Sequence, residues 1–334
     1  MRIGLAGVGR IGAFHAETLR DLAGVDEVVV SDLDTGAARA AADRLGVGYA
    51  ASPAELLTSG IDGFVIAVAT PGHAPLIREG IHAGLPTFCE KPLAGTLDEG
   101  IVLAKEVRAS DVPVHIGFQR RFDLGYRRVA QAVAGGELGF VHSVRASTHD
   151  QAPPLAAYIP TSGGLFRDCS IHDCDIVRFV TGHEVETVFA TGANKGAAFF
   201  ADAGDVDTAA ALLTLDDGTL VTLTATRYHG AGHDVRMEVA GSDGTLGVGY
   251  DDSLAVTSAE AGATNPAGPR HRSFMDRFRP AYQAELTAFV EVAKGTRPSP
   301  CTVADAVQAS RIAEACELSR HEGRVVRMEE IPTL

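Results

Sequence analysis

Gly7-Val8-Gly9-Arg10-Ile11-Gly12 is a complete G-x-G-x-x-G that separates an apolar run, Arg2–Ala6, from an amphipathic stretch, Arg10–Leu22. This order predicts a strand, a tight turn and a helix. The first glycine permits the turn, the second lets an anionic group approach the backbone, and the third lets the helix pack on the strand. The free N–H groups at the start of a helix can bind an anion. We therefore expect a dinucleotide site at this turn, made by Gly7, Gly9, Arg10, Ile11 and Gly12.

Short apolar runs alternate with stretches of helical period over the first third of the chain. Buried parallel strands have such composition, and strands joined by helices form a doubly wound sheet. We expect further strands at Glu27–Ser31, Gly63–Ala69, Thr87–Cys89 and Pro113–Gly117, and helices at Thr35–Leu45, Ala74–Ala83 and Leu97–Ala109. Residues 1–120 are therefore predicted to form a Rossmann-type α/β domain with a doubly wound parallel sheet.

From residue 121 onward, apolar and polar residues alternate, which predicts strands with one buried face. Asp216-Asp217-Gly218 and Ser242-Asp243-Gly244 have the composition of hairpin turns. The expected strands are Val141–Thr148, Val185–Thr191, Asp207–Leu215, Thr219–Tyr228, Val235–Ala240 and Leu246–Val248, and the expected helices are Arg121–Ala134, Ile171–Val180, Tyr282–Lys294 and Val303–His321. Residues 121–334 are predicted to form an α+β domain for substrate binding and oligomerisation, with a large, mostly antiparallel open sheet. Its last helices can pack back on the first domain, and the free face of the sheet suits another subunit.

An acidic residue, Asp32, ends the second expected strand 20 residues after the last glycine of the motif. A carboxylate there accepts hydrogen bonds from the adenosine ribose and repels a 2′-phosphate. No arginine stands at Leu33 or Asp34 to neutralise such a phosphate. The sequence therefore favours NAD over NADP.

Charge and cysteine content argue against several classes of protein. The formal net charge is −14 with no run of Lys and Arg, which argues against a nucleic-acid partner. No segment approaches the ~18–20 apolar residues of a membrane span, and residues 1–12 lack the features of a secretion signal. Five cysteines without a paired framework indicate a reducing compartment, so we expect a cytoplasmic protein. Cys169 and Cys174 bracket His172, but their spacing fits no standard zinc motif and a second ligand pair is missing, so we expect no metal.

Three further motifs stand at defined places along the chain: Ala69-Thr70-Pro71-Gly72-His73, Cys89-Glu90-Lys91-Pro92-Leu93-Ala94, and Gly163-Gly164-Leu165-Phe166-Arg167-Asp168 with Ile171-His172-Asp173-Cys174-Asp175. With the segment Gly117–Arg121, they resemble the glucose–fructose oxidoreductase / inositol dehydrogenase (Gfo/Idh/MocA) family. The resemblance covers essentially the whole chain and is greatest to the myo-inositol 2-dehydrogenase branch. It implies an NAD-dependent dehydrogenase, a homotetramer and a cis peptide at Lys91–Pro92.

The resemblance also implies roles for the matching residues. Lys91 matches the lysine that contacts both the nicotinamide ribose and the substrate hydroxyl, and Asp168 and His172 match the catalytic pair. Asp175 matches a substrate-holding carboxylate. The residues that fall where the family lines its cofactor cleft are Thr70, Pro71, His73, Glu90, Lys91 and Gln119.

These roles also make chemical sense without the family. Oxidation of an alcohol needs a base for the hydroxyl proton, and histidine suits this because its ring titrates near neutrality. Asp168 and His172 are four residues apart, so a helical backbone would place both on one face, with Asp175 following. Lys91 follows a parallel strand at its carboxyl end, where a cation can stabilise developing alkoxide character.

Departures from the inositol branch leave the substrate open. That branch has Gly-Tyr-Asp where this chain has Gly232-His233-Asp234, and Ala231 replaces a further tyrosine. Tyr228 is a candidate to compensate, and His149-Asp150 resembles the substrate loop of the branch; His149, Tyr228 and His233 thus join Lys91, Asp168, His172 and Asp175 as expected substrate contacts. The leading hypothesis is oxidation of a cyclic polyol, myo-inositol to 2-keto-myo-inositol. The alternatives are an aldose dehydrogenase or reductase of the same family, an NAD-dependent glycoside hydrolase, and a non-catalytic NAD-binding regulatory protein.

Overall fold

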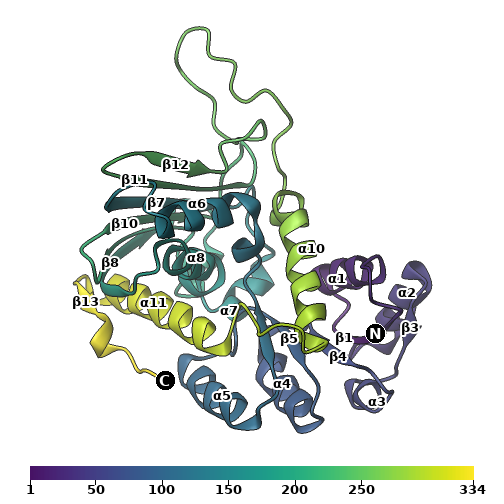
Figure 1. Cartoon of the computed structure of the whole chain (residues 1–334). Coiled ribbons are helices and arrows are strands. Elements are labelled where there is room, and N and C mark those ends of the chain that lie inside the picture. Colours follow the sequence, from purple (N-terminus) through teal and green to yellow (C-terminus); the bar gives the residue numbers. More distant parts are fainter. The chain divides into compact units, whose positions relative to one another are not determined.

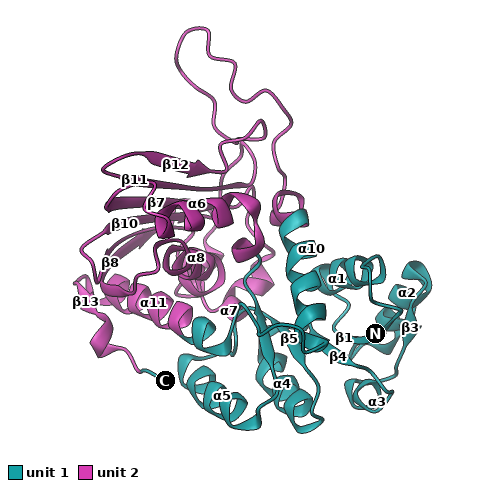
Figure 2. Ribbon diagram, in the orientation of Figure 1, with its two compact units in different colours: residues 1–119, 280–307, 333–334 teal, residues 120–279, 308–332 magenta.

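A computed structural model describes all 334 residues, and the chain divides into two compact units (Figures 1 and 2). Unit 1 comprises residues 1–119, 280–307 and 333–334, and unit 2 comprises residues 120–279 and 308–332. The boundaries at residues 280 and 308 fall inside the two long C-terminal helices, α10 (Phe274–Ala293) and α11 (Val303–Glu322). Each unit therefore contains segments that are far apart in the sequence.

Unit 1 is built on a six-stranded sheet in the order β3-β2-β1-β4-β5-β6. All its pairs are parallel, and the order reverses between β1 and β4. Its strands are β1 (Arg2–Ala6), β2 (Glu27–Ser31), β3 (Gly48–Tyr49), β4 (Gly63–Ile66), β5 (Thr87–Glu90) and β6 (Val114–Gly117). Its helices are α1 (Arg10–Arg20), α2 (Thr35–Leu45), α3 (Pro53–Leu57), the short η1 (Thr70–Gly72), α4 (His73–His82) and α5 (Leu97–Ser110). The predicted doubly wound parallel sheet is confirmed.

The core of unit 1 draws on the end of the chain as well as its beginning. Ile3, Leu5 and Phe88 of the strands pack with Leu286 and Phe289 of α10 in one buried cluster. The predicted start of this helix at Tyr282 is wrong, because α10 begins at Phe274 and continues through Pro280. Proline is normally unfavourable in the interior of a helix, yet Pro280 lies within α10.

Unit 2 contains a seven-stranded sheet in the order β12-β11-β7-β10-β9-β8-β13. Its pairs are antiparallel except that β7 and β10 run parallel, so the predicted mostly antiparallel sheet is confirmed. The strands are β7 (Val141–His149), β8 (Val185–Ala193), β9 (Thr208–Leu215), β10 (Leu220–Thr226), β11 (Asp234–Gly241), β12 (Thr245–Val248) and β13 (Val326–Arg327). The shorter helices of this unit are η2 (Gln119–Phe122), α6 (Leu124–Ala134), η3 (Ala156–Tyr158), α7 (Ile159–Ser162), η4 (Phe166–Ser170), α8 (Ile171–Thr181), α9 (Phe199–Asp202) and η5 (Met328–Glu330). The first residue of η2, Gln119, belongs to unit 1.

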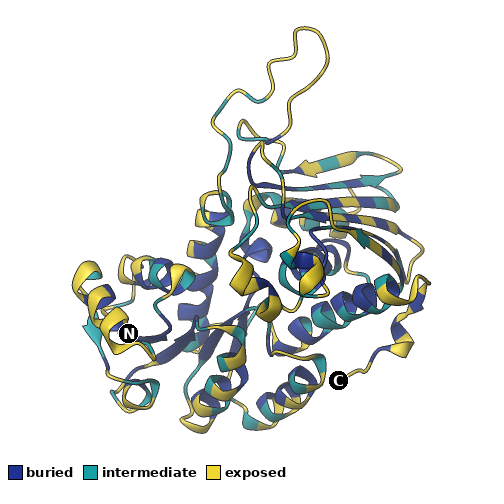
Figure 3. Ribbon diagram, turned by 180° about the vertical axis from the view of Figure 1, so that it is seen from behind, coloured by how far each residue is buried: buried dark blue, intermediate teal, exposed yellow.

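Side chains alternate between the two faces of this second sheet (Figure 3). Leu213, Val221 and Leu223 are buried on one face. On the other face Phe189 is 42% exposed, Leu212 45% and Leu220 50%. The alternation in sequence thus produces one packed face and one open face that is partly apolar.

The predicted linking helix Arg121–Ala134 begins later than expected. Residues Gln119–Phe122 form a separate 3-10 turn, and α6 starts at Leu124 because the Asp123 side chain accepts hydrogen bonds from the backbone N–H groups of Gly125 and Tyr126. None of the helices combines the length and hydropathy needed to cross a membrane.

Candidate active site

The glycine-rich turn has the geometry that a dinucleotide needs. Gly7 has φ of +95°, a conformation that other residues rarely adopt. A Cβ on Gly12 would lie 1.8 Å from the Gly7 carbonyl oxygen, so only glycine lets α1 pack this closely. A Cβ on Gly9 would meet nothing within 4 Å, and no side chain caps the helix that Gly9 precedes. The first N–H groups of α1 therefore face open space, where a pyrophosphate fits.

Asp32 follows β2 at the same edge of the sheet. Its carboxylate accepts hydrogen bonds from the backbone N–H groups of Val8 at 2.8 Å and Asp34 at 3.0 Å. These bonds fix the carboxylate beside the glycine-rich turn and occupy only two of its roughly four lone-pair directions. The remaining acceptor capacity suits the two hydroxyls of an adenosine ribose.

Lys91 stands in a loop that is held on both sides. Before it, the buried Glu90 is hydrogen-bonded to His15 of α1, with 2.6 Å between Oε1 and Nε2. After it, the Lys91–Pro92 peptide is cis, as the family resemblance implies, and the Pro92 carbonyl lies 2.6 Å from Nδ1 of His73. The loop that carries Lys91 is thereby tied to both the glycine-rich helix and α4.

His73 lies under the loops rather than on their surface. It is 1% exposed, and its Nε2 also lies 3.1 Å from the Val68 carbonyl. Burial lowers the pKa of His73, so the ring is neutral at pH 7. This ring therefore joins the loop after β4 to the loop after β5.

Gln119 completes the edge of the first sheet after β6. It is 2% exposed, and its Oε1 is buried with no hydrogen-bond partner in the protein. Thr70 and Pro71 form η1 after β4, at the same edge. The carboxyl ends of the parallel strands thus gather the glycine-rich turn, Asp32, the Thr70 turn, Lys91 and Gln119, and these residues fit a dinucleotide.

In unit 2, Asp168 is held by two partners. Its Oδ1 accepts a hydrogen bond from the Tyr158 hydroxyl at 3.0 Å, and its Oδ2 pairs with the Arg227 guanidinium at 2.6 Å. Burial and the nearby Asp168 raise the pKa of Tyr158, so this phenol stays protonated and keeps donating. The backbone from Asp168 to His172 is helical but not regular α-helix, since Asp168 lies in the π-helical turn η4 and α8 begins at Ile171, the predicted start of that helix.

Arg227 also joins Asp168 to a second carboxylate, Asp150. The Arg227–Asp150 distance is 3.0 Å, and Nδ1 of His233 lies 3.5 Å from the other Asp150 oxygen. Burial acts to raise the pKa of Asp150, but His233 and Arg227 outweigh burial and lower it to about 2. Hydrogen bonds and ion pairs thus connect Tyr158, Asp168, Arg227, Asp150 and His233 in one continuous polar group.

Two buried ion pairs fasten α8 to the turn η2. Arg121 donates to both oxygens of Asp175, at 2.8 and 2.5 Å, and Asp175 is 1% exposed. Arg120 pairs with Asp173 at 2.6 Å, and both bind Thr148. His172 directly precedes Asp173 in the first turn of α8 and is partly exposed. In this conformation Asp175 holds α8 in place through Arg121.

The other expected substrate contacts lie at strand ends of unit 2. Tyr228 comes two residues after β10, and its hydroxyl accepts a hydrogen bond from the Ala197 backbone N–H at 3.0 Å. His149 ends β7 on the same face as Ser147, the open face of the sheet, whereas Thr148 points to the packed face. His233 is the one of the three that belongs to the Asp168–Arg227–Asp150 group.

Reasoning from sequence did not single out Arg227, Tyr158 or His15. Arg227 joins the two carboxylates, Tyr158 donates to Asp168, and His15 fixes Glu90. Only His15 carried a usable signal, because it lies on the buried face of α1, where an unpaired histidine is unfavourable.

Comparison with known proteins adds two family matches. Residues 1–118 match the family model described as an oxidoreductase family with an NAD-binding Rossmann fold, and residues 126–247 match the model of the GFO/IDH/MocA C-terminal domain. A myo-inositol dehydrogenase of Streptomyces leeuwenhoekii is 38% identical, over 97% of this chain and 99% of its own.

Solved structures agree with these matches. The crystal structure of a myo-inositol dehydrogenase from Corynebacterium glutamicum has a TM-score of 0.90 with 32% identity, over 98% of each chain. The structure of scyllo-inositol dehydrogenase from Lactobacillus casei with bound NAD(H) and scyllo-inositol has a TM-score of 0.88 with 28% identity, over 98% of this chain and 99% of that one.

Proposed function

This chain belongs to the GFO/IDH/MocA oxidoreductase family, and from that premise we propose that it oxidises a secondary hydroxyl of a cyclic polyol with NAD, converting myo-inositol to 2-keto-myo-inositol. The observation that carries the proposal is full-length similarity to a myo-inositol dehydrogenase in a chain whose first sheet gathers the glycine-rich turn, Asp32 and Lys91 at one edge. NAD, when bound, accepts a hydride from the carbinol carbon.

We propose Lys91, Asp168 and His172 as the catalytic residues. His172 takes the hydroxyl proton as general base. The Lys91 ammonium donates to the hydroxyl oxygen and stabilises the negative charge that develops there. Asp168, held by Arg227 and Tyr158, orients the groups around the reacting hydroxyl. These roles require no metal.

Polar residues of unit 2 bind the remaining hydroxyls in this proposal. His233, Asp175, His149 and Tyr228 are the substrate contacts that the sequence predicts, and His233 is supported by its pairing with Asp150. For the cofactor, Gly7, Gly9, Arg10, Ile11 and Gly12 bind the pyrophosphate, and Thr70, Pro71, His73, Glu90 and Gln119 line the cleft.

The test of the function is NADH formation at alkaline pH with a panel of substrates: myo-, scyllo- and D-chiro-inositol, glucose, galactose and xylose. Turnover of myo-inositol is expected. Turnover of an aldose alone would contradict the polyol proposal and identify the protein as a sugar dehydrogenase. The assignment of the cofactor site would still hold. Absence of turnover across the panel with intact NADH binding would contradict both the polyol dehydrogenase and the sugar dehydrogenase. Release of an aglycone from a glycoside without net NADH would instead identify a hydrolase.

Asp32→Ala is expected to weaken NADH binding about tenfold to a hundredfold, the effect of losing hydrogen bonds to a charged group. NADPH binding should weaken less, because the carboxylate that repels the 2′-phosphate is gone. Dissociation constants of both cofactors, measured by fluorescence, give the result. Asp34→Ser is the matched control, since serine also caps α2. An unchanged ratio of the two constants in the Asp32 variant would show that Asp32 does not hold the ribose.

We further propose a cytoplasmic homotetramer. No disulfide joins any of the five cysteines, which fits a reducing compartment. The open sheet face carries the exposed Phe189, Leu212 and Leu220, and an apolar face of this kind is stabilised when another subunit covers it. Light scattering is expected to give four chain masses, and Leu212→Glu is expected to shift the assembly toward smaller species. A monomer in the wild type would contradict the assembly proposal.

A further inference from the structure

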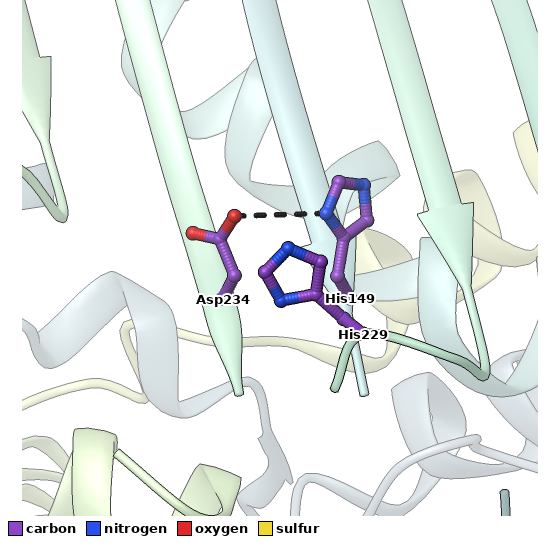
Figure 4. Close-up of side chains that lie close together, drawn as sticks. All are labelled: His149, His229 and Asp234. Atoms are coloured by element: carbon purple, nitrogen blue, oxygen red, sulfur yellow. Dashed lines mark ion pairs between the residues drawn. The ribbon is translucent and has the colours of Figure 1, made fainter. Parts of the chain in front are cut away.

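Three potential metal ligands converge at the end of the second sheet, beside the Asp168–Arg227–Asp150 group, since the His229 backbone N–H donates to the Asp150 carbonyl at 2.8 Å. They are His149 at the end of β7, His229 in the loop after β10 and Asp234 at the start of β11 (Figure 4). One ligand atom of each lies within 4.8 Å of the other two. The register of the sheet creates this arrangement, because Asp234 pairs directly with His149 across β11 and β7.

Two of these ligand atoms are buried and lack a hydrogen-bond partner. They are Nδ1 of His149 and Oδ2 of Asp234, which face each other at 3.6 Å. Asp234 is 3% exposed, and the contact of its Oδ2 with His149 is an ion pair longer than a hydrogen bond (Figure 4), so the hydrogen-bonding capacity of this buried oxygen is not met. Ligands of a tetrahedral zinc ion with bonds of about 2.0–2.1 Å lie about 3.3 Å apart, so only a small adjustment would bring both atoms into coordination.

Each of the three side chains is also held by a hydrogen bond on the side that faces away from the other two. Nδ1 of His229 lies 2.9 Å from the Gly232 carbonyl, which keeps the proton on Nδ1 and leaves the lone pair on Nε2. Nε2 of His149 lies 3.1 Å from the Thr224 hydroxyl. Arg236 donates to Oδ1 of Asp234 at 2.8 Å, which turns Oδ2 toward His149. Metal-binding histidines and carboxylates are characteristically held by such second contacts.

We propose that His149, His229 and Asp234 form a binding site for a divalent transition-metal ion, with Zn²⁺ as the best match to two imidazoles and one carboxylate. The three ligands leave one tetrahedral position for water or a substrate oxygen. The site shares His149 with the expected substrate contacts but contains none of the three proposed catalytic residues, and it stands whether or not the substrate is myo-inositol.

The chain offers an internal control. His183, Asp216 and Asp217 form a second cluster of the same residue types, but it is exposed, and His183 is already paired with Asp216 at 2.7 Å. A cation attracted only by surface charge would bind there equally well. The buried cluster is expected to bind, and the exposed one is not.

The experiment uses the full chain, stripped with a chelator and titrated with Co²⁺ in the absence of cofactor. The expected result is one Co²⁺ per chain with visible absorption typical of four-coordination, followed by displacement with Zn²⁺. His229→Ala and Asp234→Asn are expected to weaken binding by at least about a hundredfold, beyond the 10–100-fold that loss of an outer contact costs. His183→Ala should leave binding unchanged, and circular dichroism confirms that each variant is folded.

Two outcomes would overturn the proposal. One is the absence of stoichiometric Co²⁺ and Zn²⁺ binding by the wild type at micromolar concentrations. The other is loss of binding in His183→Ala with retention in folded His229→Ala, which would move the ion to the exposed cluster.

Discussion

Lys91→Met is expected to lower kcat for the polyol by about 10³-fold, the scale of losing a donor to a developing oxyanion. Methionine keeps most of the length and apolar volume of lysine but carries no charge. Glu90 and Pro92 hold the loop on either side of Lys91 through His15 and His73, so the backbone should stay in place. The loss would therefore come from the missing ammonium group. Steady-state kinetics with myo-inositol and NADH binding by fluorescence give the two readouts.

Two variants define what the Lys91 result means. Lys91→Arg retains the charge but not the compact ammonium, so it should recover only part of the activity. Lys105→Met, an exposed lysine on α5, should leave kcat unchanged. A fall in kcat of less than about tenfold for Lys91→Met, or a collapse of NADH binding, would contradict the role proposed for the ammonium.

His172→Ala is expected to lower kcat by about 10²–10⁴-fold, the usual contribution of a general base. Because the cofactor residues belong to unit 1 and His172 to unit 2, NADH binding should remain. Arg121–Asp175 and Arg120–Asp173 should keep α8 folded in the variant. Added imidazole is expected to restore part of the rate, since it can replace the missing base in the space left by the side chain.

That rescue distinguishes a base from a residue that only packs. His142→Ala, an exposed histidine on β7, serves as the matched control and should retain full activity. If His172→Ala loses NADH binding, or loses turnover without any rescue by imidazole or another small base, then His172 does not take the proton.

The cofactor half of the protein was predictable because its signals are local. Three features of the cofactor site lie within about 30 residues of one another in the sequence. They are Gly7, which adopts φ of +95°, Gly12, where a Cβ would clash, and Asp32 after the second strand. The parallel sheet follows from the alternation of short apolar runs with helical stretches. Family motifs added Lys91, Asp168 and His172, whose roles remain predictions.

The substrate half depends on long-range pairing that a sequence pattern does not contain. β7 and β10 are parallel neighbours about 70 residues apart, and this pairing brings Arg227 to Asp150 and His229 to His149. A π-helical turn at Phe166–Ser170 likewise overrides the spacing of four between Asp168 and His172. Arg121 belongs to the Gly117–Arg121 segment that the sequence singled out, yet its bonds to Asp175 became visible only with the fold.

The position of α10 has a consequence for the order in which the molecule is made. Leu286, Phe289 and Val290 complete the core around Ile3 and Phe88, and the Cys301 carbonyl accepts a hydrogen bond from Ile116 of β6. At a synthesis rate of about 5–20 residues per second, these residues leave the ribosome roughly ten to thirty seconds after the first six strands. Until then the nascent sheet exposes an apolar face. Folding of the nucleotide-binding half therefore cannot finish until the C-terminal segment has been synthesised. Until then the apolar face of the first sheet is available to a chaperone.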